Sequence, residues 1–281
     1  MGLAGLSRVG LALICLSIVN LGWAQLSDAE ILDRAAQQRT LVLSAAKHYV
    51  LAASGVDVRE SQRSLHAAQR QFEANLDVMR INAPNTLLRE SLKSLDAEWT
   101  AFNEQINSPA SNDRIEAIVE ATNTLVFLAD AISNRWGVMA SNRELEALNL
   151  SHQQAMLSER MGMLYAAHYF GLKSDWVVME LNETLHAYES SLEYFERFAS
   201  SDQAVQQHLE QVRNQWTYAK QGFAKFNQGH YLPKVIAVTV DSMQSQMGEV
   251  AHYYSNSQPV DVQPFSTLSV PGLAATAMEV E

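Results

Sequence analysis

The strongest constraint on the fold is an internal repeat of about 116 residues. A shift of 116 positions maps a group of first-half residues onto identical residues of the second half: Gln37, Gln38, Leu41, Tyr49 and Gly55 onto Gln153, Gln154, Leu157, Tyr165 and Gly171. A shift of 117 places Trp99 on Trp216, and a shift of 118 places Ile118 on Ile236. The register slips between apolar stretches, where loops absorb insertions. The chain therefore contains two copies of one structural unit.

Apolar residues recur at alternating spacings of three and four, the period of helices that pack along a seam. Each copy contains four such stripes. One runs through Val178, Leu181, Leu185, Tyr188, Leu192 and Phe195. Turn-forming residues such as 82–85 and 200–202 separate the stripes. The sequence predicts an all-α fold of two tandem up-down four-helix bundles after a cleaved signal peptide, with the bundles at 25–140 and 141–255. Because each copy has its own seam, we expect each to fold alone.

The two ends of the chain are expected to lie outside the bundles. Residues 1–24 carry one charge, Arg8, before a short apolar run and small residues near Ala24. This pattern is typical of a secretory signal peptide cleaved after Ala24, with an uncleaved anchor as the alternative. Residues 256–281 contain three prolines and lose the helical pattern, which predicts a disordered tail. The expected location is the periplasm.

Composition excludes several classes of function. The single cysteine, Cys15, leaves with the signal peptide, so disulfides and thiol catalysis are excluded in the mature chain. Of 20 basic residues, removal of Arg8 leaves 19 against 31 acidic ones, a net charge of −12, which argues against nucleic acid or anionic membrane as the main partner. No nucleophile elbow, phosphate-binding loop or zinc spacing is present, so we predict a non-enzyme without a cofactor.

Two Glu-x-x-His pairs, Glu183/His186 and Glu249/His252, have the spacing of ligands in a di-metal helical bundle. Glu183 and His252, however, fall between the stripe positions, on the outer faces of their helices. The two helices are also predicted to run parallel with the pairs roughly 13 Å apart along the axis. We therefore predict no metal site.

Residues 149–161, NLSHQQAMLSERM, resemble the first-helix motif of a known family, N-L-A-G-R-Q-R-M-L-S-Q-R-M. The family is the PilJ-type periplasmic helical sensor domain of type IV pilus chemoreceptors, which is related to the sensing domains of NarX-like nitrate/nitrite sensor kinases. Tyr165 and the pair Tyr188/Leu192 stand where the family has a tyrosine-containing turn and a later F-x-x-x-L. The first copy retains this spacing more weakly. The resemblance covers nearly all of the chain from Gln25 to Tyr254.

The resemblance also implies a ligand site, because the glycine and the two arginines of the motif are associated with binding a small anion. In this chain each copy retains a different arginine of the pair. Arg39 corresponds to Ala155 in the second copy, and Arg160 corresponds to Ser44 in the first. The predicted ligand-binding residues are the surviving guanidinium and amide donors. They form two groups, Arg39 with Gln38, and Arg160 with Gln153 and Gln154.

Gln38 and Gln154 also occupy equivalent positions on the apolar seams. A polar residue there is either a hydrogen-bonded core residue that sets the register of the helices or part of a ligand pocket. Both interpretations remain open at this point.

The function expected from these observations is that of an exported, non-enzymatic sensory module. Its ligand would be a small anion or polar metabolite, and its partner a membrane-bound chemoreceptor or sensor kinase; a homodimer is compatible with this interpretation. The alternative is a structural protein–protein interaction scaffold without a small-molecule ligand, and a metal-containing helical oxidase is a more distant third.

Overall fold

The computed structural model describes residues 26–137 and 142–257, and these are almost entirely helical. The helices are α1 (Asp28–Ala53), α2 (Val58–Asn82), α3 (Thr86–Ile106), α4 (Asn112–Gly137), α5 (Arg143–Phe170), α6 (Asp175–Phe198), α7 (Gln203–Phe223), a short 3₁₀ turn η1 (Phe226–Gln228) and α8 (Pro233–Asn256). The described part of the chain contains no strand, so the all-α prediction is confirmed. None of its helices is long and apolar enough to cross a membrane. The predicted signal peptide and nearly all of the predicted tail lie outside the described residues.

Helices α1, α3, α5 and α7 begin next to residues whose side chains cap the first turn. Ser27 and Glu30 form a reciprocal capping box at the start of α1. Asn85 accepts a hydrogen bond from the Leu88 backbone N–H at the start of α3, and Asn142 caps α5 in the same way. These caps satisfy backbone donors that a helix leaves unpaired at its first turn, which explains why the predicted breaks between the stripes become helix boundaries.

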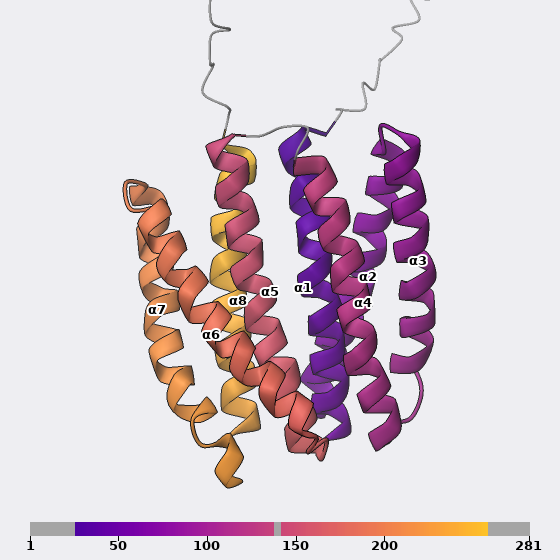
Figure 1. Cartoon of the computed structure of the whole chain (residues 1–281), viewed down its shortest axis with the longest axis vertical. Helices are drawn as coiled ribbons and strands as arrows, with labels where there is room; N and C mark the ends of the chain where they lie inside the picture. The colour runs from indigo at the N-terminus through magenta and orange to yellow at the C-terminus, as the bar shows by residue number, and fades with distance from the viewer. Residues whose placement is uncertain (1–25, 138–141, 258–281) are drawn as a thin grey trace, which may run out of the picture.

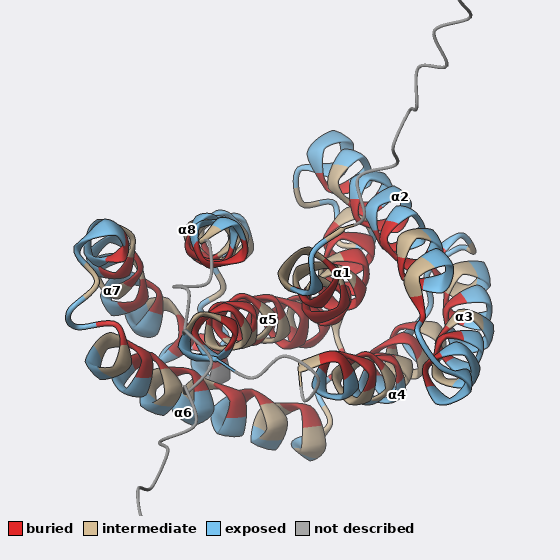
Figure 2. Ribbon diagram, turned by 90° about the horizontal axis from the view of Figure 1, so that it is seen from above, coloured by how far each residue is buried: buried red, intermediate tan, exposed pale blue. Residues whose placement is uncertain are grey.

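α1 and α5 lie side by side at the centre of the molecule (Figure 1). On one side α2 and α4 pack against α1, and α3 packs against α4. On the other side α6 and α8 pack against α5, and α7 packs against α8 (Figure 2). In addition, α4 contacts α5 and α8 contacts α1. The two repeats are therefore arranged with approximate twofold symmetry, in which α5 is the counterpart of α1 and α8 the counterpart of α4.

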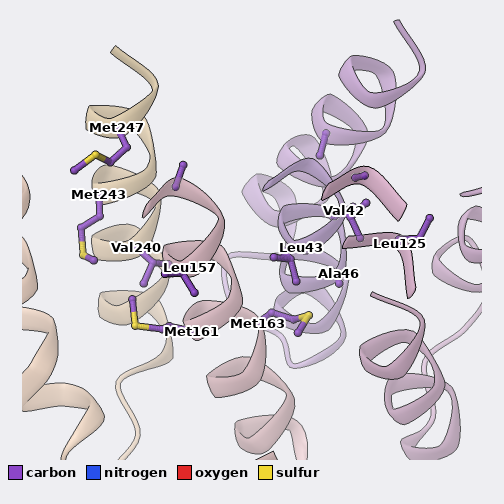
Figure 3. Packing of buried hydrophobic residues seen from close by; sticks show 14 of the residues in the cluster. Val42, Leu43, Ala46, Leu125, Leu157, Met161, Met163, Val240, Met243 and Met247 are labelled. Carbon is purple, nitrogen blue, oxygen red and sulfur yellow. The ribbon is translucent and has the colours of Figure 1, made fainter. Parts of the chain in front are cut away.

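The central helices are buried on almost all sides, and this differs from the single stripe predicted for each. On α1, every residue from 45 to 51 is buried, and this run of nearly two turns covers all sides of the helix. Met163 from α5 lies beside Leu43 and Ala46, while Met161 faces α8 (Figure 3). The buried apolar residues therefore form one core that continues across both repeats. This packing argues against the expectation that each copy folds alone.

The repeated tyrosines have equivalent structural roles. The Tyr49 hydroxyl donates a hydrogen bond of 2.9 Å to the carbonyl of Ser108, in the loop between α3 and α4. The Tyr165 hydroxyl accepts one of 2.7 Å from the backbone N–H of Leu232, which directly precedes α8. Each tyrosine thus ties the last turns of the first helix of its repeat to the loop before the fourth helix.

Candidate functional site

A groove of about 610 Å³ lies between α1, α4 and α5, where the two repeats meet. Arg39 from α1, and Gln153 and Arg160 from α5, are three of the five predicted ligand-binding residues, and all three line it. The remaining lining residues come from α4 and α5: Asn123, Val126, Phe127, Asp130, Asn134, Asn149 and Met156. The two arginines that the sequence assigns to different copies therefore meet in one site.

Arg39 is nearly buried, with 4% of its surface exposed. Its guanidinium donates to Asp130 on α4 at 2.5 Å and to the Oδ1 atom of Asn149 on α5 at 3.0 Å, and its Nε donates to the Ala36 carbonyl at 3.3 Å. Burial lowers the pKa of Arg39, and the Asp130 carboxylate opposes this shift. The positive charge of Arg39 is therefore paired within the protein, and its side chain connects α1 with α4 and α5.

Arg160 occupies the other end of the groove. Its guanidinium donates to the Oδ1 atom of Asn123 on α4 at 2.7 Å and also pairs with the Glu180 carboxylate on α6. Both arginines of the groove thus have a carboxylate partner. The four charges of Arg39, Asp130, Arg160 and Glu180 sum to zero.

The arginines also orient the amides of the groove. Because Arg39 and Arg160 bind the Oδ1 atoms of Asn149 and Asn123, the NH₂ group of each asparagine remains as a donor. Gln153 also lines the groove, and its side chain makes no hydrogen bond with the described residues. The groove therefore offers several amide donors and two amide carbonyls, those of Gln153 and Asn134, that no described side chain binds. Phe127 stands at its edge with 71% of its surface exposed.

Gln38 and Gln154, the other two predicted site residues, do not line the groove. Gln38 is buried in the first repeat and donates to the Phe72 carbonyl at 3.1 Å. Gln154 is buried in the second repeat and donates to the Ser191 hydroxyl. The predicted pairing of Arg39 with Gln38 therefore does not form one site, because consecutive helical residues point in different directions. Both side chains are hydrogen-bonded core residues, although neither amide oxygen has a partner among the described residues.

The opposite face of the α1–α5 pair contains a buried ion cluster instead of an open groove. Lys47 on α1 is fully buried, and its Nζ lies 2.7 Å from Oε2 of Glu159 on α5. The same ammonium pairs with Asp241 on α8. The Nε2 atom of His48 is 3.7 Å from Asp241. One ammonium thus meets two carboxylates where three helices converge.

The two faces have related geometry. A shift of 118 residues relates Asn123 on α4 to Asp241 on α8. Arg160 of the second repeat reaches Asn123 of the first, and Lys47 of the first reaches Asp241 of the second. In each case a basic residue on a central helix connects to the fourth helix of the other repeat. A further contact between the repeats, of 2.6 Å, joins His152 on α5 to Asp33 on α1.

Gly162 makes room for the buried lysine. A Cβ atom at this position would lie 2.9 Å from Cδ of Lys47 and 2.8 Å from Cγ2 of Val240. Both distances are shorter than carbon atoms tolerate in a packed core. The Lys47 side chain can therefore pass α5 only because residue 162 lacks a side chain.

Burial shifts the titration of the cluster. Burial raises the pKa of Glu159 to about 7, although the Lys47 ammonium opposes the shift. Burial and the neighbouring Lys47 lower the pKa of His48 to about 3, so this imidazole is neutral at physiological pH. Burial lowers the pKa of Lys47, but the attraction of Glu159 and Asp241 outweighs it and raises the pKa above its ordinary value. Lys47 is therefore charged.

Sequence reasoning missed the buried ion cluster and also the α4 residues and Asn149 that complete the groove. Lys47 carries the charge of an ordinary surface residue, and only its position on a helix with few exposed residues could have indicated burial. Asn123, Asp130 and Asn149 line the groove only because α4 packs against α1 and also contacts α5, an arrangement that the repeat pattern does not predict.

Within residues 26–137 and 142–257, no group of three or more His, Cys, Asp or Glu side chains is placed to hold a metal ion. Comparison with protein-family models, curated proteins and solved structures finds no match for the chain. The resemblance to PilJ-type sensor domains therefore rests on the motif residues alone.

Proposed function

We propose that this protein is an exported, non-enzymatic sensory module that binds a small polar ligand in the groove between α1, α4 and α5. In this proposal each repeat corresponds to one four-helix input unit of the PilJ type. The observation that carries the proposal is the convergence of Arg39, Gln153 and Arg160 in one groove. These are donors of the repeated motif, and they come from both copies.

The groove has the physical features that ligand recognition requires. Its polar groups are held by contacts within the protein, since each guanidinium is bonded to a carboxylate and to an asparagine. Such preorganisation lowers the entropic cost of binding. The apolar side chains of Phe127 and Met156 lie beside the donors, a combination common in small-molecule sites.

Ligand binding at this position would act on the relation between the two repeats. The groove is lined by α4 from the first repeat and α5 from the second, so a ligand that contacts both changes the free energy of their separation. We propose that this change is read by a membrane-bound chemoreceptor or sensor kinase.

The proposal is tested by thermal-shift and calorimetric screening of nitrate, nitrite, organic acids and uncharged metabolites. Wild type is compared with Gln153→Ala and with Gln37→Ala, the change at the equivalent position of the first repeat. Gln37 lies outside the groove lining and accepts a hydrogen bond from Asn75. We expect Gln153→Ala to weaken binding about fivefold, the loss of one hydrogen bond of about 1 kcal/mol. Gln37→Ala should alter stability and leave affinity unchanged.

A structural scaffold remains the second candidate. The pairing of Arg39 with Asp130 and of Arg160 with Glu180 favours it, because both pairs connect helices and need no ligand. If no compound shifts the melting temperature of wild type, the sensory proposal fails and the scaffold interpretation stands.

A further inference from the structure

We infer that the groove selects an uncharged, acceptor-rich ligand with a planar apolar body, such as a carboxamide, in preference to a small anion. The inference rests on the proposed function and specifies its ligand class. The relevant observations are the pairing of both guanidiniums, the orientation of the asparagine amides and the exposed ring of Phe127.

A small anion meets a poor electrostatic environment in the groove. Arg39 and Arg160 each already face a carboxylate, and the charges of these two pairs sum to zero. An anion that binds either guanidinium must displace the carboxylate already paired with it, Asp130 or Glu180, or lie beside it. In the second case the two negative charges repel each other. The net charge of the chain, −11, adds to this opposition at low ionic strength.

A small cation is also disfavoured. An ammonium group brings a positive charge that needs a counter-charge, and the carboxylates beside the groove, Asp130 and Glu180, are already paired with its two arginines. The two Asp130 oxygens already accept hydrogen bonds, Oδ1 from Arg39 at 2.5 Å and Oδ2 from Asn134 at 2.8 Å. The NH₂ groups of Asn123 and Asn149 would face the cation with their positive ends.

An uncharged carbonyl compound satisfies the groups that remain. Its oxygen can accept from the NH₂ group of Asn123 or Asn149, whose own oxygens are bonded to the arginines. Its N–H or O–H groups can donate to the amide oxygen of Gln153. A planar ring can pack on Phe127, which is 71% exposed at the groove edge.

The test compares matched amides and acids, benzamide with benzoate and propionamide with propionate, by titration calorimetry at neutral pH. We expect wild-type protein to bind benzamide at least tenfold more tightly than benzoate. This is the loss expected when the charged acid fails to make one hydrogen bond that the amide makes. Propionamide should bind more weakly than benzamide because it lacks a ring for Phe127.

The decisive variant is Glu180→Gln, which leaves the Arg160 guanidinium without its carboxylate. This change should strengthen benzoate binding about tenfold and leave benzamide binding nearly unchanged. Asp130→Asn provides a second measurement at Arg39 if the first variant folds poorly. Glu210→Gln, which removes an exposed carboxylate on α7, is the control for net charge alone.

The outcomes separate the ligand class from the proposed function. Equal or tighter binding of benzoate by wild type overturns the inference while a groove ligand is still supported. Binding of neither compound by wild type or by Glu180→Gln overturns the inference and counts against the sensory function as well. Preference for benzamide in wild type, with a gain of benzoate binding in Glu180→Gln, supports both.

Discussion

The Nζ atom of Lys47 lies 2.7 Å from a carboxylate oxygen of Glu159, and both side chains are buried between the two repeats. Because Asp241 shares the same ammonium, the cluster holds one negative charge in excess when Glu159 is ionised. Removal of one partner from such a cluster would leave a buried charge uncompensated, which is costly. The junction of the repeats therefore depends on the protonation state of Glu159.

We predict that Glu159→Gln changes how stability varies with pH. Since burial raises the pKa of Glu159 to about 7, the folded protein retains a proton that the unfolded chain releases above about pH 4.5. The contribution of Glu159 to stability is therefore fully present below about pH 4.5 and is lost as the pH rises to about 7. Because glutamine does not titrate, the Glu159→Gln variant does not lose stability in this way as the pH rises. From pH 5 to pH 8 its unfolding free energy should rise by about 2 kcal/mol relative to wild type.

The other groups that face Glu159 do not reverse this sign. Lys47 and Asp241 are the charged groups in contact, and the Lys47 pKa is raised. His48 has a pKa lowered to about 3, so its contribution is lost as the pH falls from 6.5 to 3, in both proteins alike. Urea denaturation at several pH values measures the difference. A constant difference between Glu159→Gln and wild type across this range would show that Glu159 does not titrate there.

We predict opposite effects for two glycine-to-alanine changes. In Gly162→Ala the new methyl group meets Lys47 and Val240 at less than 3.0 Å, and overpacking of this kind costs about 1–3 kcal/mol. The gain in helix propensity is only about 1 kcal/mol, so the variant should be destabilised. Gly248→Ala is the matched control, because nothing lies within 4 Å of its added Cβ. That variant should be stabilised by roughly 0.5–1 kcal/mol. Stabilisation by both changes would contradict the close packing at Gly162.

We predict similar losses for Tyr49→Phe and Tyr165→Phe. Each removes one hydrogen bond between a central helix and the loop before the fourth helix of its repeat. The expected cost is about 1 kcal/mol for each variant. Tyr218→Phe, at an exposed residue, should change stability by less than about 0.5 kcal/mol. Thermal unfolding followed by circular dichroism compares the three variants. Equal stability of all three would show that the repeated tyrosines do not have this structural role.

We predict that the two repeats do not fold independently. Expressed alone, residues 26–139 would expose the face of α1 that packs on α5, and residues 140–257 would expose the reciprocal face. Each fragment should show reduced helicity and a broad melt, and mixing the two should restore a cooperative transition. Two fragments that each melt cooperatively, with no change on mixing, would support the earlier expectation of independent bundles.

The helical fold follows from local features of the sequence. Apolar spacing and capping residues such as Ser27, Asn85 and Asn142 specify the helices and their starts, and these signals act over a few residues. The equivalence of Tyr49 and Tyr165 could also be predicted, because the repeat places them at the same point of the same helix.

The packing of α1 against α5 could not be predicted in the same way. Small residues such as Ala46 form part of this interface and leave no strong apolar period. The composite groove depends on that packing, because Arg39 and Arg160 come from different repeats. Burial of Lys47 likewise requires the convergence of three helices around Gly162, which no local pattern encodes.

The most direct test of the account is to locate the bound ligand by NMR. The side-chain NH₂ signals of Asn123, Asn149 and Gln153 would be assigned by single substitution and followed during titration with benzamide. The account predicts that all three shift together with one saturable dependence, because they line one groove. Unmoved signals at these residues, with changes only near the separate pocket around Tyr231, would contradict it.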